Sequence, residues 1–212
     1  MTETSATETS APVLKNIFGD DWHKLPRVFH RHYACRAGTD DTAVCEGVLD
    51  IRTSWLGRLL APLFYLSGTL VPYAGTNIRA KVTFESAQKS GRSGMAFDRV
   101  FYFPGRKPYR FRSFLQPTGG NQITETTRLG LGWRAAFVWT GEKIDMQHRG
   151  YSLMFFGKAL PFPAEWLIGR SHASETAIDD DRFAMTMDIT HPLWGHVLGY
   201  SGIFSMTKDA TP

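Results

Sequence analysis

Residues 95–128 read MAFDRVFYFPGRKPYRFRSFLQPTGGNQITETTR, and this stretch decides the fold. Apolar and polar side chains alternate in three runs, which are separated by turns rich in proline and glycine at 104–108 and 117–120. Because alternate side chains of a β-strand point to opposite faces, each run predicts a strand and each turn predicts a hairpin. The stretch therefore predicts three consecutive antiparallel strands.

A polar residue interrupts the apolar face of each predicted strand. These residues are Arg99, Ser113 and Glu125. A charge on an apolar face is costly unless it is paired or has a ligand, so this row is the strongest candidate for a site. The apolar residues that share its face are Phe97, Phe101, Phe111, Leu115 and Ile123.

The two turns set the expected registers. Pairing Phe103 with Tyr109 places the arginine opposite the serine. Pairing Pro117 with Asn121 places the serine opposite the glutamate. The three polar side chains should then lie side by side on the concave face of the sheet.

The rest of the chain extends this pattern to a mostly β (α+β) fold. Helices are predicted over 20–33 and 55–66, and residues 42–53 alternate like a strand. A flat sheet of this size tends to curl or close, so we expect one strongly curved antiparallel sheet or a partly closed β-barrel of about nine strands with two helices. The strands after residue 75 are predicted over 77–86, 95–104, 109–116, 122–127, 131–140, 143–156, 171–178, 182–190 and 196–206.

Composition limits the class of protein. Residues 1–12 carry almost no large apolar side chain and predict a disordered tail, which leaves 13–212 as a single β-rich domain. The net charge of +4 comes from scattered basic residues, so nucleic-acid binding is not expected. Cys35 and Cys45 are too few for a disulfide framework and indicate reduced thiols in a cytoplasmic protein.

The most apolar window is 55–74, which Arg58, Pro62 and Pro72 interrupt. It lacks the run of about 20 apolar residues that a membrane-spanning helix needs, so no transmembrane segment is predicted. Its main interpretation is a helix packed on the core and followed by a loop. A helix lying on a membrane surface is the alternative.

The sequence predicts neither a metal nor a cofactor. The seven histidines and two cysteines show no metal-ligand spacing. Gly130-Leu131-Gly132 has no third glycine and no following helix, so it is not a dinucleotide-binding fingerprint.

Several short motifs, taken in their order along the chain, resemble the bacterial family called domain of unknown function 4166. The resemblance implies little chemistry by itself. Similar domains occur behind saccharopine-dehydrogenase-like NAD(P)-binding domains, which implies an accessory role and a possible reductase partner. The matching motifs are Leu25-Pro26, Arg31-His32, Cys45-Glu46-Gly47, the segment 56–61, Phe97 with Arg99 and Phe101, Phe111 with Ser113, Glu125, the segment 157–161, Phe183, the segment 192–196 and Tyr200-Ser201-Gly202.

The polar row allows two interpretations. Arg99 could hold the anionic end of a ligand bidentately, with Ser113 adding a hydroxyl and Glu125 orienting the arginine. The alternative is an internal ion pair of Arg99 with Glu125 that fixes the strand register. Glu125 is also the candidate general acid or base, should apolar surroundings raise its pKa.

Three functions follow from these interpretations. The leading one is an accessory domain that binds a small, largely apolar ligand with an anionic end, with Phe97, Phe101 and Phe111 around the polar row. The second is a cyclase- or isomerase-type enzyme that uses Glu125. The third is an interaction module that docks on an NAD(P)-dependent reductase. A cavity with Glu125 unpaired would favour the enzyme, and a filled core with Arg99 bound to Glu125 would favour the interaction module.

Overall fold

The computed structural model describes residues 11–89, 91–156 and 158–210. Residues 1–10 of the predicted tail lie outside this part of the chain. Pro12 is described and forms an isolated β-bridge with Arg36.

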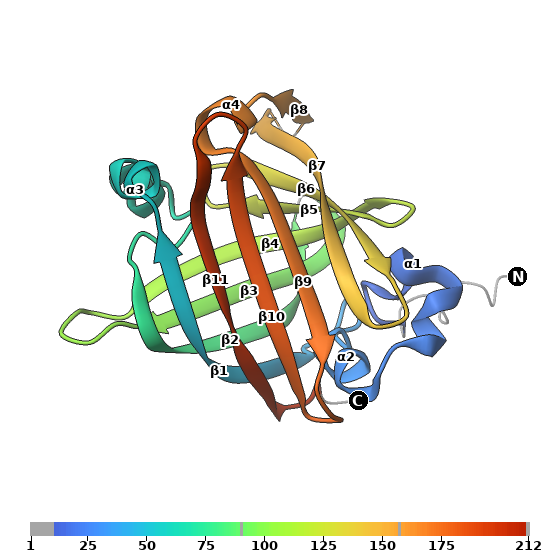
Figure 1. The fold of residues 1–212 in the computed structure, drawn as a ribbon. Coiled ribbons are helices and arrows are strands. Elements are labelled where there is room, and N and C mark those ends of the chain that lie inside the picture. Colours follow the sequence, from blue (N-terminus) through green and yellow to red (C-terminus); the bar gives the residue numbers. More distant parts are fainter. Residues whose placement is uncertain (1–10, 90, 157, 211–212) are drawn as a thin grey trace, which may run out of the picture.

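The described residues form one antiparallel sheet of eleven strands, and ten of them close into a barrel (Figure 1). The sheet runs β6-β5-β4-β3-β2-β1-β11-β10-β9-β7-β8, and pairing of β6 with β7 closes it. The strands are β1 (Thr42–Thr53), β2 (Gly75–Lys89), β3 (Arg92–Tyr102), β4 (Tyr109–Gly119), β5 (Gln122–Thr127), β6 (Leu131–Trp139), β7 (Lys143–Phe155), β8 (Lys158–Phe162), β9 (Arg170–Ala177), β10 (Arg182–His191) and β11 (Gly195–Lys208).

The predicted fold class is therefore confirmed, and the structure extends it in two respects. The sheet closes into a barrel, because the last strand of the first meander pairs with β7 over most of its length. The strand count rises from about nine to eleven because β1 belongs to the barrel and because β8 was not predicted. The short β8 contains Pro161, a residue that is rare inside strands and hides them from pattern analysis.

One seam of the barrel is incomplete. Strand β7 pairs with β9 only over Lys143–Met146. Beyond Gly150 the same edge of β7 pairs instead with the short β8. The helix α4 (Glu165–Ile168) follows β8 and lies beside the gap at the upper end of the barrel in Figure 1.

The predicted helix over 20–33 is wrong as a single element. The chain instead forms α1 (Lys15–Phe18), the 3-10 helix η2 (Gly19–Lys24) and α2 (Arg27–His32). Leu25 is extended, with a ψ of 140°, because the residue before a proline is sterically excluded from the helical region. Among the described residues the structure has four α-helices and one 3-10 helix, where the expected fold counted two helices.

The predicted helix over 55–66 is confirmed as α3 (Trp55–Ser67). The Ser54 side chain accepts a hydrogen bond from the backbone N–H of Gly57 at 3.3 Å and so caps its first turn. Gly68 follows in the left-handed conformation, which ends the helix.

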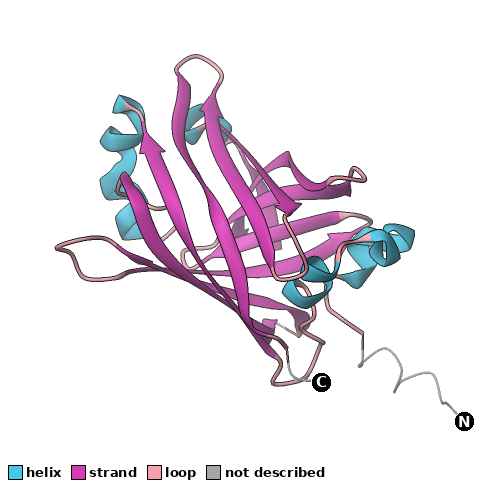
Figure 2. Ribbon diagram, turned by 60° about the horizontal axis from the view of Figure 1, so that its bottom comes forward, coloured by secondary structure: helices cyan, strands magenta, loops and turns pink. Residues whose placement is uncertain are grey.

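The helices cover opposite ends of the barrel, and Figure 2 shows α3 and the N-terminal helices on opposite sides of the sheet. At one end, α1 and α2 insert Phe18 and Phe29 against Phe137, Trp139 and Phe183 of the barrel wall. At the other end, Phe64 of α3 joins a second, smaller cluster of buried residues, which contains Tyr151, Ala164 and Ile168. The interior between these two clusters holds the candidate site.

Candidate functional site

The predicted polar row forms inside the barrel, although both hairpin registers differ from the expected ones. Arg99 pairs with Phe111 rather than Ser113, and Glu125 pairs with Leu115. Each predicted register is wrong by two residues. Because side-chain direction repeats every two residues, such an error leaves all three polar side chains on the predicted face.

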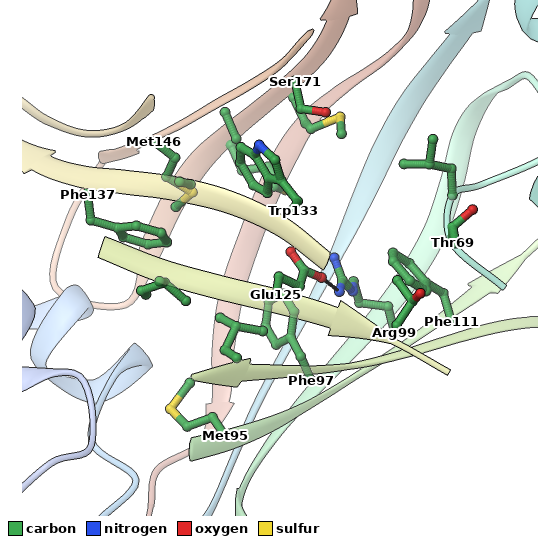
Figure 3. Close-up of a pocket in the computed structure, with 18 of the residues that line it drawn as sticks. Thr69, Met95, Phe97, Arg99, Phe111, Glu125, Trp133, Phe137, Met146 and Ser171 are labelled. Carbon is green, nitrogen blue, oxygen red and sulfur yellow. Dashed lines mark hydrogen bonds and ion pairs between the residues drawn. The ribbon is translucent and has the colours of Figure 1, made fainter. Parts of the chain in front are cut away.

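The three polar side chains bind one another at the barrel wall, and Figure 3 shows Arg99 beside Glu125. Arg99 donates from Nη2 to Ser113 Oγ at 2.6 Å and forms an ion pair with Glu125 Oε1. Ser113 Oγ donates to the same glutamate oxygen at 2.7 Å. The guanidinium carbon lies 4.2 Å from the ring centre of Phe97 and 4.0 Å from that of Phe111. Stacking between two aromatic rings suits the flat, weakly hydrated guanidinium.

Arg99 keeps one donor unused. Its Nε atom is buried and has no hydrogen-bond partner among the described residues. A buried donor without a partner costs about 1–3 kcal/mol. This N–H is therefore a contact that a molecule inside the barrel could satisfy, while the ligand-binding role of the row stays a prediction.

The polar row borders an interior cavity of about 100 Å³. Ser113 is not among the residues that line this cavity, but its hydroxyl bonds to both of the other polar side chains. Phe101 borders a neighbouring cavity of about 30 Å³. The predicted site residues that line the larger cavity are Arg99, Glu125, Phe97 and Phe111.

This arrangement matches neither the enzyme, which required a cavity with Glu125 unpaired, nor the interaction module, which required a filled core. A cavity is present, as an enzyme or a binding protein requires. Arg99 is nevertheless bound to Glu125, so Glu125 is not the unpaired carboxyl that the enzyme interpretation required.

The remaining wall of the cavity is mostly apolar and adaptable. It includes the aromatic side chains Trp133 and Phe137 and four methionines, of which Met95 and Met146 appear in Figure 3. Methionine side chains have three rotatable bonds and repack easily around guests of different shape. The other two methionines are Met185 and Met187.

A second polar group, which the sequence analysis missed, lies in the same cavity wall. Glu175 of β9 is only 4% exposed and accepts a hydrogen bond from the Tyr33 hydroxyl at 2.7 Å. His32 Nε2 lies 3.8 Å from the other carboxyl oxygen of Glu175. The Nδ1 atom of His32 is buried and has no partner among the described residues. Glu175, Tyr33 and His32 are called the inner acid cluster below.

Burial sets the protonation of the inner acid cluster. Burial raises the pKa of Glu175 from 4.5 to about 7, and the hydrogen bond from Tyr33 lowers it only in part. Burial also lowers the pKa of His32 from 6.5 to about 3. Between about pH 4 and pH 6 the pair is therefore a neutral carboxylic acid beside a neutral imidazole.

Tyr200 connects the two polar groups of the cavity. Burial raises the pKa of the Tyr200 hydroxyl. The positive charge of Arg99 lowers this pKa, and the nearby carboxyls of Glu125 and Glu175 raise it. The hydroxyl therefore lies within the electrostatic reach of both groups, and the cavity holds a charge-balanced arginine on one side and a titratable carboxyl on the other.

A weak sequence signal for Glu175 existed. In β9 the residues Ser171, Ala173 and Ala177 share its face, whereas the opposite face is entirely polar. A glutamate among small residues on the less polar face indicates an inward carboxyl. Its partners on α2 could not be found in this way, because they lie more than 140 residues away in the sequence.

Trp133 is fixed at the upper part of the cavity by a short relay. Its Nε1 donates to His148 Nδ1 at 3.1 Å, so the proton of the neutral imidazole is on Nε2. That nitrogen lies 2.9 Å from Glu165 Oε1 of α4. The relay ties the indole to the helix that lies beside the seam.

The order of the motifs agrees with the result of a family comparison. The sequence profile described as "Domain of unknown function (DUF4166)" matches residues 25–204. The chain belongs to the DUF4166 family. The match covers every residue that lines the cavity, so the polar row and Glu175 are parts of the DUF4166 domain itself. An association with saccharopine-dehydrogenase-like proteins stays a prediction.

Comparison with curated proteins gives no match. Solved structures with a similar course of the chain share little sequence with this DUF4166 domain. The crystal structure of Rv2717c from M. tuberculosis has 10% identity and a TM-score of 0.42, covering 78% of this chain and 91% of that one. A fluorescence-activating β-barrel of de novo design has 9% identity and a TM-score of 0.25, covering 76% of this chain and 91% of that one. At these TM-scores the likenesses carry no argument about the fold or the function of this chain.

Two further findings describe the same part of the chain. No helix among the described residues is both long and apolar enough to cross a membrane. The described residues also contain no group of three or more histidine, cysteine, aspartate or glutamate side chains arranged to hold a metal ion.

Proposed function

We propose that the barrel binds a small, largely apolar molecule in its interior cavity. The observation that carries this proposal is a cavity of about 100 Å³ with mostly apolar walls and two polar groups at fixed places. A site of this kind, apolar with a few convergent polar groups, is typical of small-molecule binding. Two unpartnered buried polar atoms, Arg99 Nε and His32 Nδ1, give such a molecule specific hydrogen-bond partners.

The cavity size limits the guest. An apolar cavity of about 150 Å³ accommodates a molecule the size of benzene. Drug-sized ligands need about 300–1,000 Å³. The guest is therefore compact, or it enters as a narrow chain with rearrangement of the methionine side chains.

The geometry favours a neutral polar end over the anionic end that the sequence predicted. Glu125 already neutralises Arg99, and Glu175 is a second carboxyl in the same cavity. A ligand carboxylate would add an unbalanced negative charge to an apolar interior, which is costly. A hydroxyl or carbonyl oxygen can instead accept from Arg99 Nε without that cost.

Two measurements test the proposal. Native mass spectrometry of freshly purified protein should show a retained small molecule. Benzyl alcohol and benzoate then serve as matched probes, because they share a ring and differ in the charge of the polar end. A bound guest raises the thermal midpoint, and we expect the alcohol to raise it more than benzoate does. A larger rise of the thermal midpoint with benzoate would favour the ligand with an anionic end that the sequence predicted.

A cavity-filling variant provides the control. Ala173→Leu adds volume inside the cavity, whereas Ala184→Leu adds the same volume on the outer wall of the neighbouring strand. We expect Ala173→Leu to abolish the shift caused by benzyl alcohol and Ala184→Leu to preserve it. Retained binding by Ala173→Leu would place the guest outside this cavity and refute the proposal.

Glu175 supports a second candidate function, proton transfer within the cavity. Its carboxyl faces no cation among the described residues and is buried, so it can take up and release a proton near neutral pH. As an isomerase, the carboxylate would accept a proton from one carbon of the guest and return it to another, with no oxidant or reductant needed. Glu175 would thus replace Glu125 as the acid or base.

Deuterium exchange separates the two candidates. An enzyme of this kind should introduce solvent deuterium at a carbon of the retained molecule, as seen by mass spectrometry. Glu175→Gln should stop the exchange and leave binding intact. A guest that binds without any exchange would leave the protein a carrier.

A further inference from the structure

Exposed apolar side chains gather at one end of the barrel. Of the eighteen large hydrophobic side chains that are exposed among the described residues, fourteen lie on α3, the β5–β6 turn, the β7–β8 hairpin, α4 and the β10–β11 turn. The other four are Val48, Tyr102, Ile178 and Ile203. Single exposed apolar residues are ordinary, but a contiguous set of this size marks an interaction surface. These fourteen side chains are called the apolar rim.

Contacts between successive segments show that the segments that carry the apolar rim adjoin one another. Trp55 of α3 packs edge-on against Trp194 of the β10–β11 turn, with ring centres 5.8 Å apart. In the next contact, His191 Nε2 lies 3.1 Å from the backbone oxygen of Trp166 in α4. At the β5–β6 turn, Met154 of β7 donates its backbone N–H to the oxygen of Gly130 at 2.9 Å. Figure 1 shows α3, the β10–β11 turn, α4 and β8 in the upper part of the molecule.

The charges on these segments, on the adjoining strand ends and on the β3–β4 turn at the same end of the barrel are almost all positive. Glu165 is the one acidic residue within 52–66, 103–108, 128–131, 149–170 and 190–196. It is half-buried and already bound to His148. The exposed basic residues of these segments are Arg52, Arg58, Arg106, Lys107, Arg128, Arg149 and Arg170. The rim thus has a charge balance far from that of the whole chain, whose 24 basic residues face 20 acidic ones.

The apolar rim surrounds the end of the barrel that is covered more lightly. The opposite end is filled by α1, η2 and α2, which belong to the main hydrophobic core. At the rim end, the cover is the small cluster of Phe64 with Tyr151, Ala164 and Ile168. Leu70, Ile168 and Leu131 of this region also line the interior cavity.

We propose that the apolar rim docks on the surface of a lipid bilayer that contains anionic lipids. Tryptophan, tyrosine and leucine beside arginine and lysine are the side chains that enter the boundary between headgroups and acyl chains. Each basic residue near an anionic surface adds about 1 kcal/mol to binding. The combination distinguishes this occupant from a second copy of the chain, which would bring the same positive charge against the rim.

This inference stands on the outer surface and does not depend on a guest in the cavity. It also gives the segment 55–66 the surface role that its sequence allowed as an alternative to simple packing. In this orientation the lightly covered end of the barrel faces the apolar layer of the membrane.

Vesicle co-sedimentation tests the docking. The full chain should sediment with vesicles made of equal parts of phosphatidylcholine and phosphatidylglycerol, and much less with phosphatidylcholine alone. Binding should fall as salt is added, because salt screens the basic residues. Absence of sedimentation with the anionic vesicles at low salt would overturn the proposal.

Apolar variants locate the docking surface. Leu66, Trp166 and Leu193 are 71%, 73% and 72% exposed, so changing all three to glutamine should leave the thermal midpoint nearly unchanged. We expect at least about a tenfold loss of vesicle affinity, since each of these side chains loses its transfer into the lipid. The matched control changes the exposed Val48, Ile178 and Ile203 to threonine and should keep full affinity. An equal loss in both triple variants would refute the proposal.

Charge variants make the second comparison. Arg58→Glu with Arg128→Glu reverses two rim charges, neither of which has an ion-pair partner among the described residues. We expect a loss of about tenfold or more. Arg92→Glu with Lys208→Glu reverses two exposed charges at the other end and should have little effect. If light scattering shows a dimer that the apolar triple variant converts to monomer, while vesicles do not bind, the rim is a contact between copies and the proposal fails.

Discussion

Replacing Glu175 with glutamine should change how the stability of the protein depends on pH. The pKa of the buried carboxyl is raised from 4.5 to about 7. A raised pKa in the folded state stabilises the protein below the pKa of the unfolded chain, and this stabilisation is lost as the pH rises through the folded pKa. With 1.36 kcal/mol for each unit, the loss between about pH 4 and pH 8 amounts to about 3 kcal/mol.

His32 acts in the opposite direction. Burial lowers the pKa of His32 from 6.5 to about 3. The stability that His32 contributes is therefore complete above pH 6.5 and is lost as the pH falls toward 3. In the wild-type protein the two contributions therefore oppose each other across the acidic range. A glutamine at position 175 keeps an oxygen that accepts from Tyr33, but the glutamine side chain does not titrate. The change therefore removes the pH dependence that comes from Glu175 and leaves that from His32.

The measurement is urea unfolding, followed by tryptophan fluorescence, at several values between about pH 4 and pH 8. We expect Glu175→Gln to match the wild type at the acidic end and to exceed it by about 3 kcal/mol at the alkaline end. Glu46→Gln, an exposed change on the outer wall of β1, is the control and should shift neither end. Parallel curves for the wild type and Glu175→Gln would show that Glu175 does not titrate as its burial implies.

Three further predictions concern the polar row, the thiols and the tail. Arg99→Met should lower the free energy of unfolding by about 3–5 kcal/mol, because it leaves the partly buried Glu125 without its cation, and adding Glu125→Gln should recover much of this loss; additive losses in a denaturation cycle would contradict the structural ion pair. Cys35 and Cys45 are buried, and burial raises the pKa of each thiol, so neither should react with a thiol reagent until the protein unfolds; rapid labelling of the native protein would refute this. Deleting residues 1–10, which carry almost no large apolar side chain, should leave the thermal midpoint unchanged, whereas a fall of several degrees would show that they pack.

The sequence predicted the face of each site residue better than it predicted the neighbours. Both hairpin registers shift by two residues, a change that the alternation of side chains cannot detect because its period is two. The long side chain of Arg99 spans the resulting diagonal and still meets Ser113 and Glu125. The polar row was therefore predictable as a cluster, while its hydrogen bonds were not.

The inner acid cluster was beyond sequence reasoning for a different reason. Glu175 is a buried acid only because α2 brings Tyr33 and His32 into the barrel end. That packing depends on the break of the N-terminal helix at Leu25-Pro26, which was expected to lie within one continuous helix. Because the helix break near residue 25 was not predicted, the contact of α2 with Glu175, about 150 residues further along the chain, was not predicted either.

The incomplete seam between β7 and β9 allows one end of the barrel to open without loss of the stability of the whole barrel. Near α4 this gap is bridged by the Tyr151 hydroxyl, which donates to the backbone oxygen of Gly169 at 3.0 Å. Few backbone hydrogen bonds must break for β8 and α4 to move outward there, so this region can open without global unfolding. The residence time of a molecule inside would then depend on this local opening rather than on the stability of the barrel. A change such as Tyr151→Phe would shorten the residence time of a guest while its equilibrium contacts with Arg99 stay the same.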